Sequence, residues 1–108
     1  LINAGLFTNS QGFFRDVCST GGVKSFVNQG WYDMALAVDP MDHEIVWAGG
    51  IDLFRSDDGG VNFGFASYWA ARGTSSHVHS DQHLVVFHPN YDGAGNQVMY
   101  SANDGGVY

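Results

Sequence analysis

The chain has 108 residues and a formal net charge of −7, from eleven Asp and Glu against four Lys and Arg. That balance argues against nucleic-acid binding, which needs basic surfaces, and against docking on anionic membranes. No apolar run approaches the ~18 residues of a membrane-spanning helix, so we expect no membrane insertion. Fifteen glycines and many aromatic residues instead indicate an all-β chain with numerous turns.

The first predicted element, residues 1–17, is the end of one repeating unit, with a degenerate turn at residues 9–14. Cys18 is the single cysteine, so it cannot form an internal disulfide. We expect it to be a buried small side chain or a partner for sequence outside this chain. A connection at residues 28–33 then leads into the next unit.

Residues 34–67 are predicted to form one whole unit of four antiparallel strands. Short runs of β-branched and aromatic residues alternate there with turn residues. The predicted strands are residues 34–39, 45–48 and 53–56, with a fourth from Phe63.

Residues 82–108 are predicted to form a second, incomplete unit, with strands at 84–88, 97–101 and 106–108. Residues 36–40 recur at 85–89, which lies 49 positions later in the chain. Periods near fifty residues with several short strands are typical of β-propeller blades, and a closed ring needs at least four blades. We therefore expect about two to two and a half blades of a partial propeller, stable only within a parent propeller, an oligomer or another assembly.

The turn at residues 56–63 carries the most specific motif. Ser56 and Asp58 can hydrogen-bond the turn's own backbone, and Gly60 can adopt a positive φ. Phe63 is expected to return into the blade as an apolar anchor. These residues fit the pattern Ser-x-Asp-x-Gly-x-Thr-Trp/Phe, except that Asn62 stands where the pattern has Thr.

The chain resembles the Asp-box (BNR-repeat), sialidase-like β-propellers through this turn and through four further runs. Those runs are residues 30–40, 46–50, 79–83 and 103–108. Xyloglucanase-type glycoside hydrolases and sortilin-type receptors belong to the same superfamily. The resemblance implies an extracellular or cell-surface protein. It gives no support to a sialidase, which needs an arginine triad, because the only arginines are Arg15, Arg55 and Arg72.

A polar stripe precedes the second unit. His77, His79, Asp81 and His83 occupy every second position, so an extended chain would project them to one face. Imidazoles and a carboxylate at this spacing are a candidate Zn²⁺ or Cu²⁺ site. We favour a metal-free hydrogen-bond network, with Asp81 and His83 the most buried of the four, and we expect no cofactor.

Strand alternation places this stripe on the rim opposite the Asp-box turn. The equivalent connection one unit earlier carries Trp31, Tyr32 and Asp33, and Trp69 lies in the second connection. Aromatic rings beside carboxylates suit sugars, although Trp31 and Trp69 are at least as well explained as wedges between blades. We therefore expect a ligand-binding or scaffold module for a polysaccharide or protein partner. The alternative is a xyloglucanase-type glycoside hydrolase with Asp33 or Asp81 as one of two catalytic carboxylates.

Overall fold

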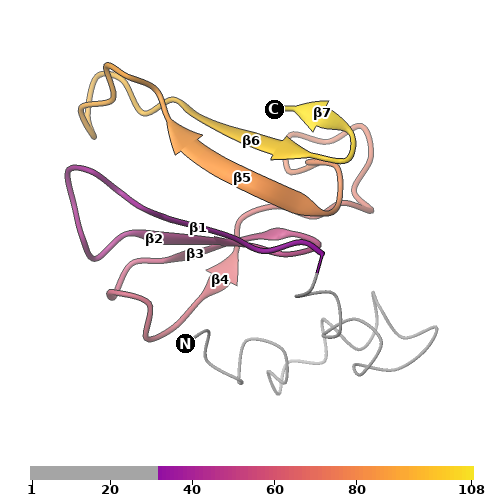
Figure 1. Ribbon diagram of the computed structural model, residues 1–108, viewed down its shortest axis with the longest axis horizontal. Helices are drawn as coiled ribbons and strands as arrows, with labels where there is room; N and C mark the ends of the chain where they lie inside the picture. Colours follow the sequence, from indigo (N-terminus) through magenta and orange to yellow (C-terminus); the bar gives the residue numbers. More distant parts are fainter. Residues whose placement is uncertain (1–31) are drawn as a thin grey trace.

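The computed structural model describes residues 32–108, and predictions for residues 1–31, Trp31 among them, lie outside that part. The described residues form two antiparallel sheets, with strand orders β1-β2-β3-β4 and β5-β6-β7 (Figure 1). None of them belongs to a helix long and apolar enough to span a bilayer. The strands are β1 Ala35–Val38, β2 Val46–Gly49, β3 Leu53–Ser56, β4 Gly64–Phe65, β5 Gln82–Phe87, β6 Met99–Asn103 and β7 Gly106–Val107.

The first sheet packs face to face on the second, with β1 and β2 against β5. Strand alternation sorts the side chains. Ala35 points into the inter-sheet core and is 7% exposed, whereas its neighbour Leu36 points away and is 66% exposed. Leu53 and Val85 complete the buried centre, and the half-buried side chains around it come from both sheets and from the segment before β5. Those half-buried side chains are Ala37, Trp47, Val78 and Met99.

Gln82 fastens the two sheets together and is fully buried. Its side-chain amide nitrogen, Nε2, donates to the carbonyl oxygens of His79 at 2.5 Å and Ile51 at 3.3 Å. Its Oε1 accepts a hydrogen bond of 2.5 Å from the Ser101 hydroxyl. The sheets meet so closely here that a Cβ at Gly49 would lie 2.7 Å from the Gln82 Cβ. Glycine is therefore required at this crossing.

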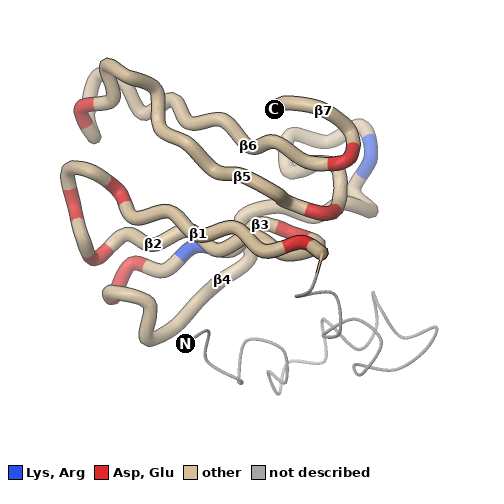
Figure 2. Tube along the Cα trace, viewed as in Figure 1, with Lys and Arg blue, Asp and Glu red and all other residues tan. Residues whose placement is uncertain are grey.

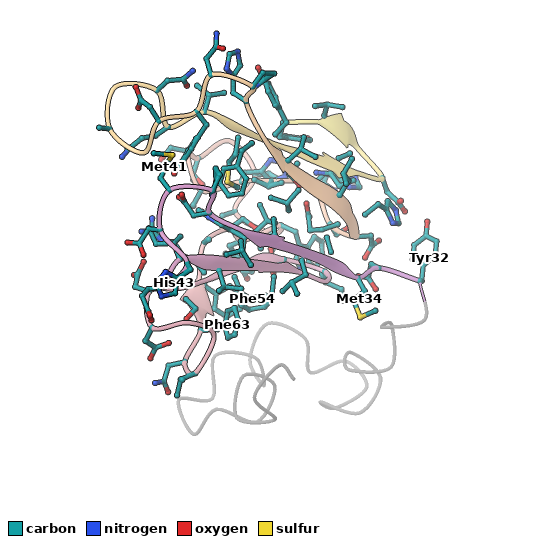
Figure 3. All side chains as sticks on the ribbon, turned by 60° about the vertical axis from the view of Figure 1, so that its left-hand side comes forward. Tyr32, Met34, Met41, His43, Phe54 and Phe63 are labelled. Carbon is teal, nitrogen blue, oxygen red and sulfur yellow. The ribbon has the colours of Figure 1, made fainter. Side chains whose placement is uncertain are left out.

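The turns gather at two opposite ends of the stacked sheets. At one end lies the turn at residues 56–63, which we call the Asp-box turn after the motif that its sequence resembles. The Gly59 N–H of this turn donates to the Glu44 carbonyl at 2.9 Å. The β1–β2 turn at this end also touches the β5–β6 turn, where Gly93 lies against Met41. Tyr32 lies at the other end, far from Met41 (Figure 3). Acidic residues occupy turns at both ends (Figure 2).

The all-β, antiparallel prediction is confirmed for the described residues, and β3 has the predicted bounds. The second strand of the second unit was expected at residues 97–101 but runs from Met99 to Asn103. The preceding turn explains the difference, because Gln97 donates from its side chain to the Gly93 carbonyl and Val98 donates to Asn96 Oδ1. Both residues are held in the turn rather than in the strand.

Candidate functional site

The Asp-box turn is held by its own side chains. The Ser56 hydroxyl donates to Asp58 Oδ1 at 2.7 Å and accepts from the Gly60 N–H at 2.9 Å. Asp58 also accepts from the Asn62 backbone at 2.8 Å and from its side-chain amide at 2.7 Å. Those Asn62 bonds, with the Ser56 hydroxyl, lower the Asp58 pKa to about 2. Asn62 thus hydrogen-bonds the Asp58 carboxylate directly. The Ser56 hydroxyl, the Asp58 carboxylate and the Asn62 amide all have partners within the turn.

Phe63, which was predicted to return into the blade as an apolar anchor, is not fully buried. It is only half-buried, and its ring lies 3.7 Å from the position a Cβ would take at Gly60. The interior aromatic is Phe54, which is 2% exposed and contacts the ring of Phe65 at 4.9 Å. Phe63 therefore lies over Gly60, and Phe54 is the buried aromatic side chain of this sheet.

The opposite end of the sheets holds the candidate site, centred on Asp33. This residue is 2% exposed, and neither carboxylate oxygen has a hydrogen-bond partner among the described residues. Burial, together with the neighbouring Asp81 carboxyl, raises the Asp33 pKa to about 6, although its own backbone N–H and His83 act to lower it. Asp33, Asp81 and His83 are thus brought together, as the sequence predicts for the two connections.

A second buried carboxyl, Asp52, lies near Asp81. It is 1% exposed and accepts hydrogen bonds from the Trp69 N–H at 2.7 Å and the Ser67 hydroxyl at 3.4 Å. Burial raises its pKa to about 6 despite those two bonds, and Asp81 adds to the increase. The Asp81 carboxyl therefore lies near two buried carboxyls and raises the pKa of both.

The exposed rim of the site is a Tyr32–Asp104–His83 group. The Tyr32 hydroxyl donates to the Asp104 carboxylate at 3.0 Å, and His83 Nε2 lies 2.6 Å from Asp104 Oδ1. The Tyr32 and His83 rings meet edge to face at 5.1 Å. Hydrogen bonds from His83 and Tyr32 lower the Asp104 pKa. An aromatic ring, an imidazole and a carboxylate therefore stand at the solvent boundary above Asp33.

The period-two geometry predicted for the polar stripe is wrong. Asp81 has a φ of 67°, a left-handed conformation that breaks the extended chain between His79 and His83. The predicted order of burial is also wrong, because His83 is exposed and the fully buried side chain of the segment is Gln82. Gln82 is buried in place of its neighbours because its side-chain amide is hydrogen-bonded to Ile51, in the β2–β3 loop, and to Ser101, in β6.

The other two histidines of the stripe make separate contacts. The His79 ring fills the space over Gly105, where a Cβ would lie 2.4 Å from the ring, and its Nδ1 lies 3.2 Å from the Ser80 carbonyl. The ring of His77 lies 6.3 Å from that of Tyr108. Over residues 32–108, no three His, Cys, Asp or Glu side chains are placed to hold a metal ion.

Trp69, a predicted ligand-binding aromatic, is fixed by hydrogen bonding and is only partly exposed to solvent. Its backbone N–H is bound to Asp52, and its indole N–H is buried with no hydrogen-bond partner in the described part of the chain. The ring is half-buried. The Trp69 backbone therefore holds the Asp52 carboxyl by a hydrogen bond, and Tyr32 is the more exposed aromatic side chain of the site.

Sequence reasoning missed Asp52, Gln82 and Asp104. Asp52 and Asp104 lie in the loops after the second strand of each unit, and strand alternation assigns those loops to the same end as the polar stripe. That signal was available. No sequence signal shows that Gln82 would be buried, because its partners are backbone carbonyls and a serine from other segments.

A cavity of about 340 Å³ opens between the sheets at the Asp-box end, beside Trp47 and Arg55. Its carboxylates already have partners: Asp39 accepts from two turn N–H groups and the Tyr91 hydroxyl, and Asp92 accepts from two more N–H groups. The Arg55 guanidinium is paired with an aspartate in the Asp-box turn at 2.7 Å. The Asp33 end keeps unpartnered polar groups, so it is the better candidate site.

Comparisons with protein-family models, with curated proteins and with solved structures found no match to this chain.

Proposed function

We propose that this chain supplies blades of an Asp-box β-propeller and acts outside the cell as a ligand-binding or scaffold module. The Asp-box turn supports the blade assignment, because its side chains make the bonds that the motif requires. The parent protein or an oligomer would supply the remaining blades. The ligand would be a polysaccharide or a protein, held at the end that carries Tyr32, Asp33, Asp81 and His83.

One observation carries this proposal: the buried Asp33 carboxyl, with no partner for either oxygen among the described residues. A buried polar group without a hydrogen bond is costly, so such groups are rare outside sites that bind or react. Sugar hydroxyls are donors that could satisfy it, while the exposed Tyr32 ring offers an apolar face to the sugar. The acidic surroundings favour a neutral glycan over an anionic one.

The test is calorimetric titration of the full chain with xyloglucan oligosaccharides. We expect saturable binding that weakens at least tenfold in Asp33→Asn and in Tyr32→Ala. Asp92→Asn, in the exposed β5–β6 turn at the other end, is the matched control and should bind like the wild type. No binding, or equal binding by Asp33→Asn and the wild type, contradicts this site assignment.

A glycoside hydrolase of the xyloglucanase type is the second candidate. The observation that favours it is the raised pKa of Asp33, about 6, beside the second carboxyl of Asp81. A carboxyl with a raised pKa can serve as a general acid, and glycoside hydrolysis needs a second carboxyl beside it. Release of reducing ends from xyloglucan, lost in both Asp33→Asn and Asp81→Asn, would establish this activity. Binding without release leaves the module as a non-catalytic binder.

A further inference from the structure

The cavity between the sheets at the Asp-box end is separate from the Asp33 site at the other end. Its volume of about 340 Å³ lies within the range of small-molecule sites, ~300–1,000 Å³. Both sheets supply its walls, with Trp47 from β2, Phe87 from β5 and Met99 from β6. The β1–β2 and β5–β6 turns, which are neighbours at this end, supply the rest (Figure 1). The cavity therefore depends on the packing of the two sheets.

Aromatic rings form part of the cavity wall. Trp47, Phe87 and Tyr91 all line the cavity and are half-buried. The rings of Phe87 and Tyr91 meet at 4.8 Å. The guanidinium carbon of Arg55 lies 5.6 Å from the centre of the Trp47 ring, so one cation already contacts this wall. Aromatic faces attract cations, and they do so more strongly where water is partly excluded.

Asp39 contributes a buried carboxylate to the same cavity, and this side chain is only 5% exposed. Its Oδ1 accepts from the N–H groups of Met41 at 2.8 Å and Asp42 at 3.2 Å, whereas its Oδ2 accepts from the Tyr91 hydroxyl. Burial acts to raise the Asp39 pKa, but these hydrogen bonds lower it overall, so the group is ionised at neutral pH. A carboxylate oxygen can accept two hydrogen bonds. Asp39 Oδ2 can therefore accept one more donor.

The charges around the cavity are unbalanced. Asp39, Asp42 and Asp92 line it, and Arg55 is the one basic residue that does. The Arg55 guanidinium is already paired with Asp57, at 2.8 Å from Nε and 2.7 Å from Nη2. In the described part of the chain, no basic side chain forms an ion pair with Asp39. The cavity should therefore attract a cation more strongly than a neutral or anionic molecule.

We propose that this cavity binds a small organic cation, a primary ammonium group on an aromatic body of about the size of benzylammonium. The ammonium group donates to Asp39 Oδ2, and the aromatic body lies among the rings of Trp47, Phe87 and Tyr91. A primary ammonium fits better than a quaternary one, which has no N–H to donate. The proposal goes beyond the glycan site and shares no residue with it, so either can fail without the other.

Heteronuclear NMR titration of the full chain with benzylamine at pH 7 tests this site, because benzylamine, like lysine, is protonated at that pH. We expect saturable shifts of the Trp47 indole signal and none of the Trp69 indole signal, which belongs to the other end. Benzyl alcohol has the same shape without the charge, and it should bind at least tenfold more weakly. Raised salt should weaken the binding of benzylamine, because ions screen its attraction to the carboxylates.

Two variants separate the contributions of charge and ring. Asp39→Asn keeps an acceptor for the turn N–H groups but removes the charge, and it should weaken benzylamine binding at least tenfold. Phe87→Leu keeps an apolar wall but removes one ring, and it should weaken binding severalfold. Glu44→Gln is the matched control and should bind like the wild type. It removes the same charge from the same turn, but its side chain is 52% exposed and lies outside the cavity lining.

Circular dichroism must show that each variant keeps the wild-type β spectrum. If Asp39→Asn does not, Asp42→Asn replaces it, because this exposed carboxylate also lines the cavity and its loss should weaken binding more than that of Glu44. The proposal is overturned if ~10 mM benzylamine, well above a Kd of ~1 mM, shifts no cavity signal. Equal binding of benzyl alcohol and benzylamine also overturns it, as does wild-type binding by the folded charge and ring variants.

Discussion

The aspartates at the two ends of the molecule have pKa values that are shifted in opposite directions. At the Asp-box end, Asp58 accepts several hydrogen bonds, which lower its pKa to about 2. At the other end, burial raises the pKa of Asp33 and of Asp52 to about 6. The first arrangement stabilises the folded chain at neutral pH, and the second destabilises it. Such a cost is typical of sites shaped for function.

The stability of the chain should therefore fall between about pH 4 and pH 6. Asp33 has a pKa near 3.9 when unfolded and about 6 when folded, so the folded state binds more protons in that window and loses stability as pH rises. We expect a loss of roughly 1–3 kcal/mol in the free energy of unfolding, measured by urea denaturation. Below about pH 4 the carboxylates with lowered pKa values reverse the trend, because they lose their hydrogen bonds as they protonate.

Asp33→Asn should be more stable than the wild type at pH 7, and the part of the fall above pH 4 that Asp33 causes should disappear, while the part that Asp52 causes remains. Its amide carries no charge and can donate to Asp81. Asp57→Asn, whose side chain is 71% exposed, is the control and should keep the wild-type pH profile. Stability that rises from pH 4 to pH 7 in the wild type would contradict the buried-carboxyl account.

Ser56→Ala should destabilise the Asp-box turn by about 1–3 kcal/mol. Ser56 is 1% exposed, and its hydroxyl is the acceptor for the Asp58 and Gly60 N–H groups. Urea unfolding measures the loss. Asp57→Ala, at the exposed position next to it, is the control and should change stability by less than about 0.5 kcal/mol. Equal effects of the two variants would show that the hydroxyl bonds do not hold the turn.

At the scale of elements, the sequence predicts the strands well and the connections poorly. β3 could be predicted to the residue because a glycine-rich loop and the Asp-box turn bound it on both sides. The segment before β5 could not, since its course is set by long-range bonds from Asp81 and Gln82 to the β2–β3 loop. The left-handed Asp81 follows from those bonds. A period-two pattern cannot reveal such a constraint.

The crossing of the two sheets at Gly49 gives a direct test of how closely the elements pack. Gly49→Ala would place a Cβ 2.7 Å from the Gln82 Cβ and 3.0 Å from the Ala35 Cβ, so the sheets must separate. We expect a loss of about 1–3 kcal/mol in urea unfolding. Gly50→Ala is the matched control, because a Cβ there meets nothing within 4 Å. A Gly49→Ala variant as stable as Gly50→Ala would contradict the close packing.

For the molecule as a whole, the described residues form a stack of two sheets with structural turns at one end and buried carboxyls at the other. The antiparallel fold could be predicted from the repeat, and so could the placement of the polar stripe near Tyr32 and Asp33. The burial of Asp33 and Asp52 could not, because it depends on how the sheets and loops close over them. The proposed binding function depends on that burial.

The most direct test is a carbon-13 NMR titration of the Asp33 carboxyl, with and without xyloglucan oligosaccharides. The free chain should show an Asp33 pKa of about 6. Bound sugar hydroxyls should donate to the carboxylate and lower that pKa, because hydrogen bonds to the charged form favour it. An Asp33 pKa of 4 or below in the free chain would contradict the buried, unpartnered carboxyl. An Asp33 pKa that stays near 6 with saturating oligosaccharide would contradict its role in binding.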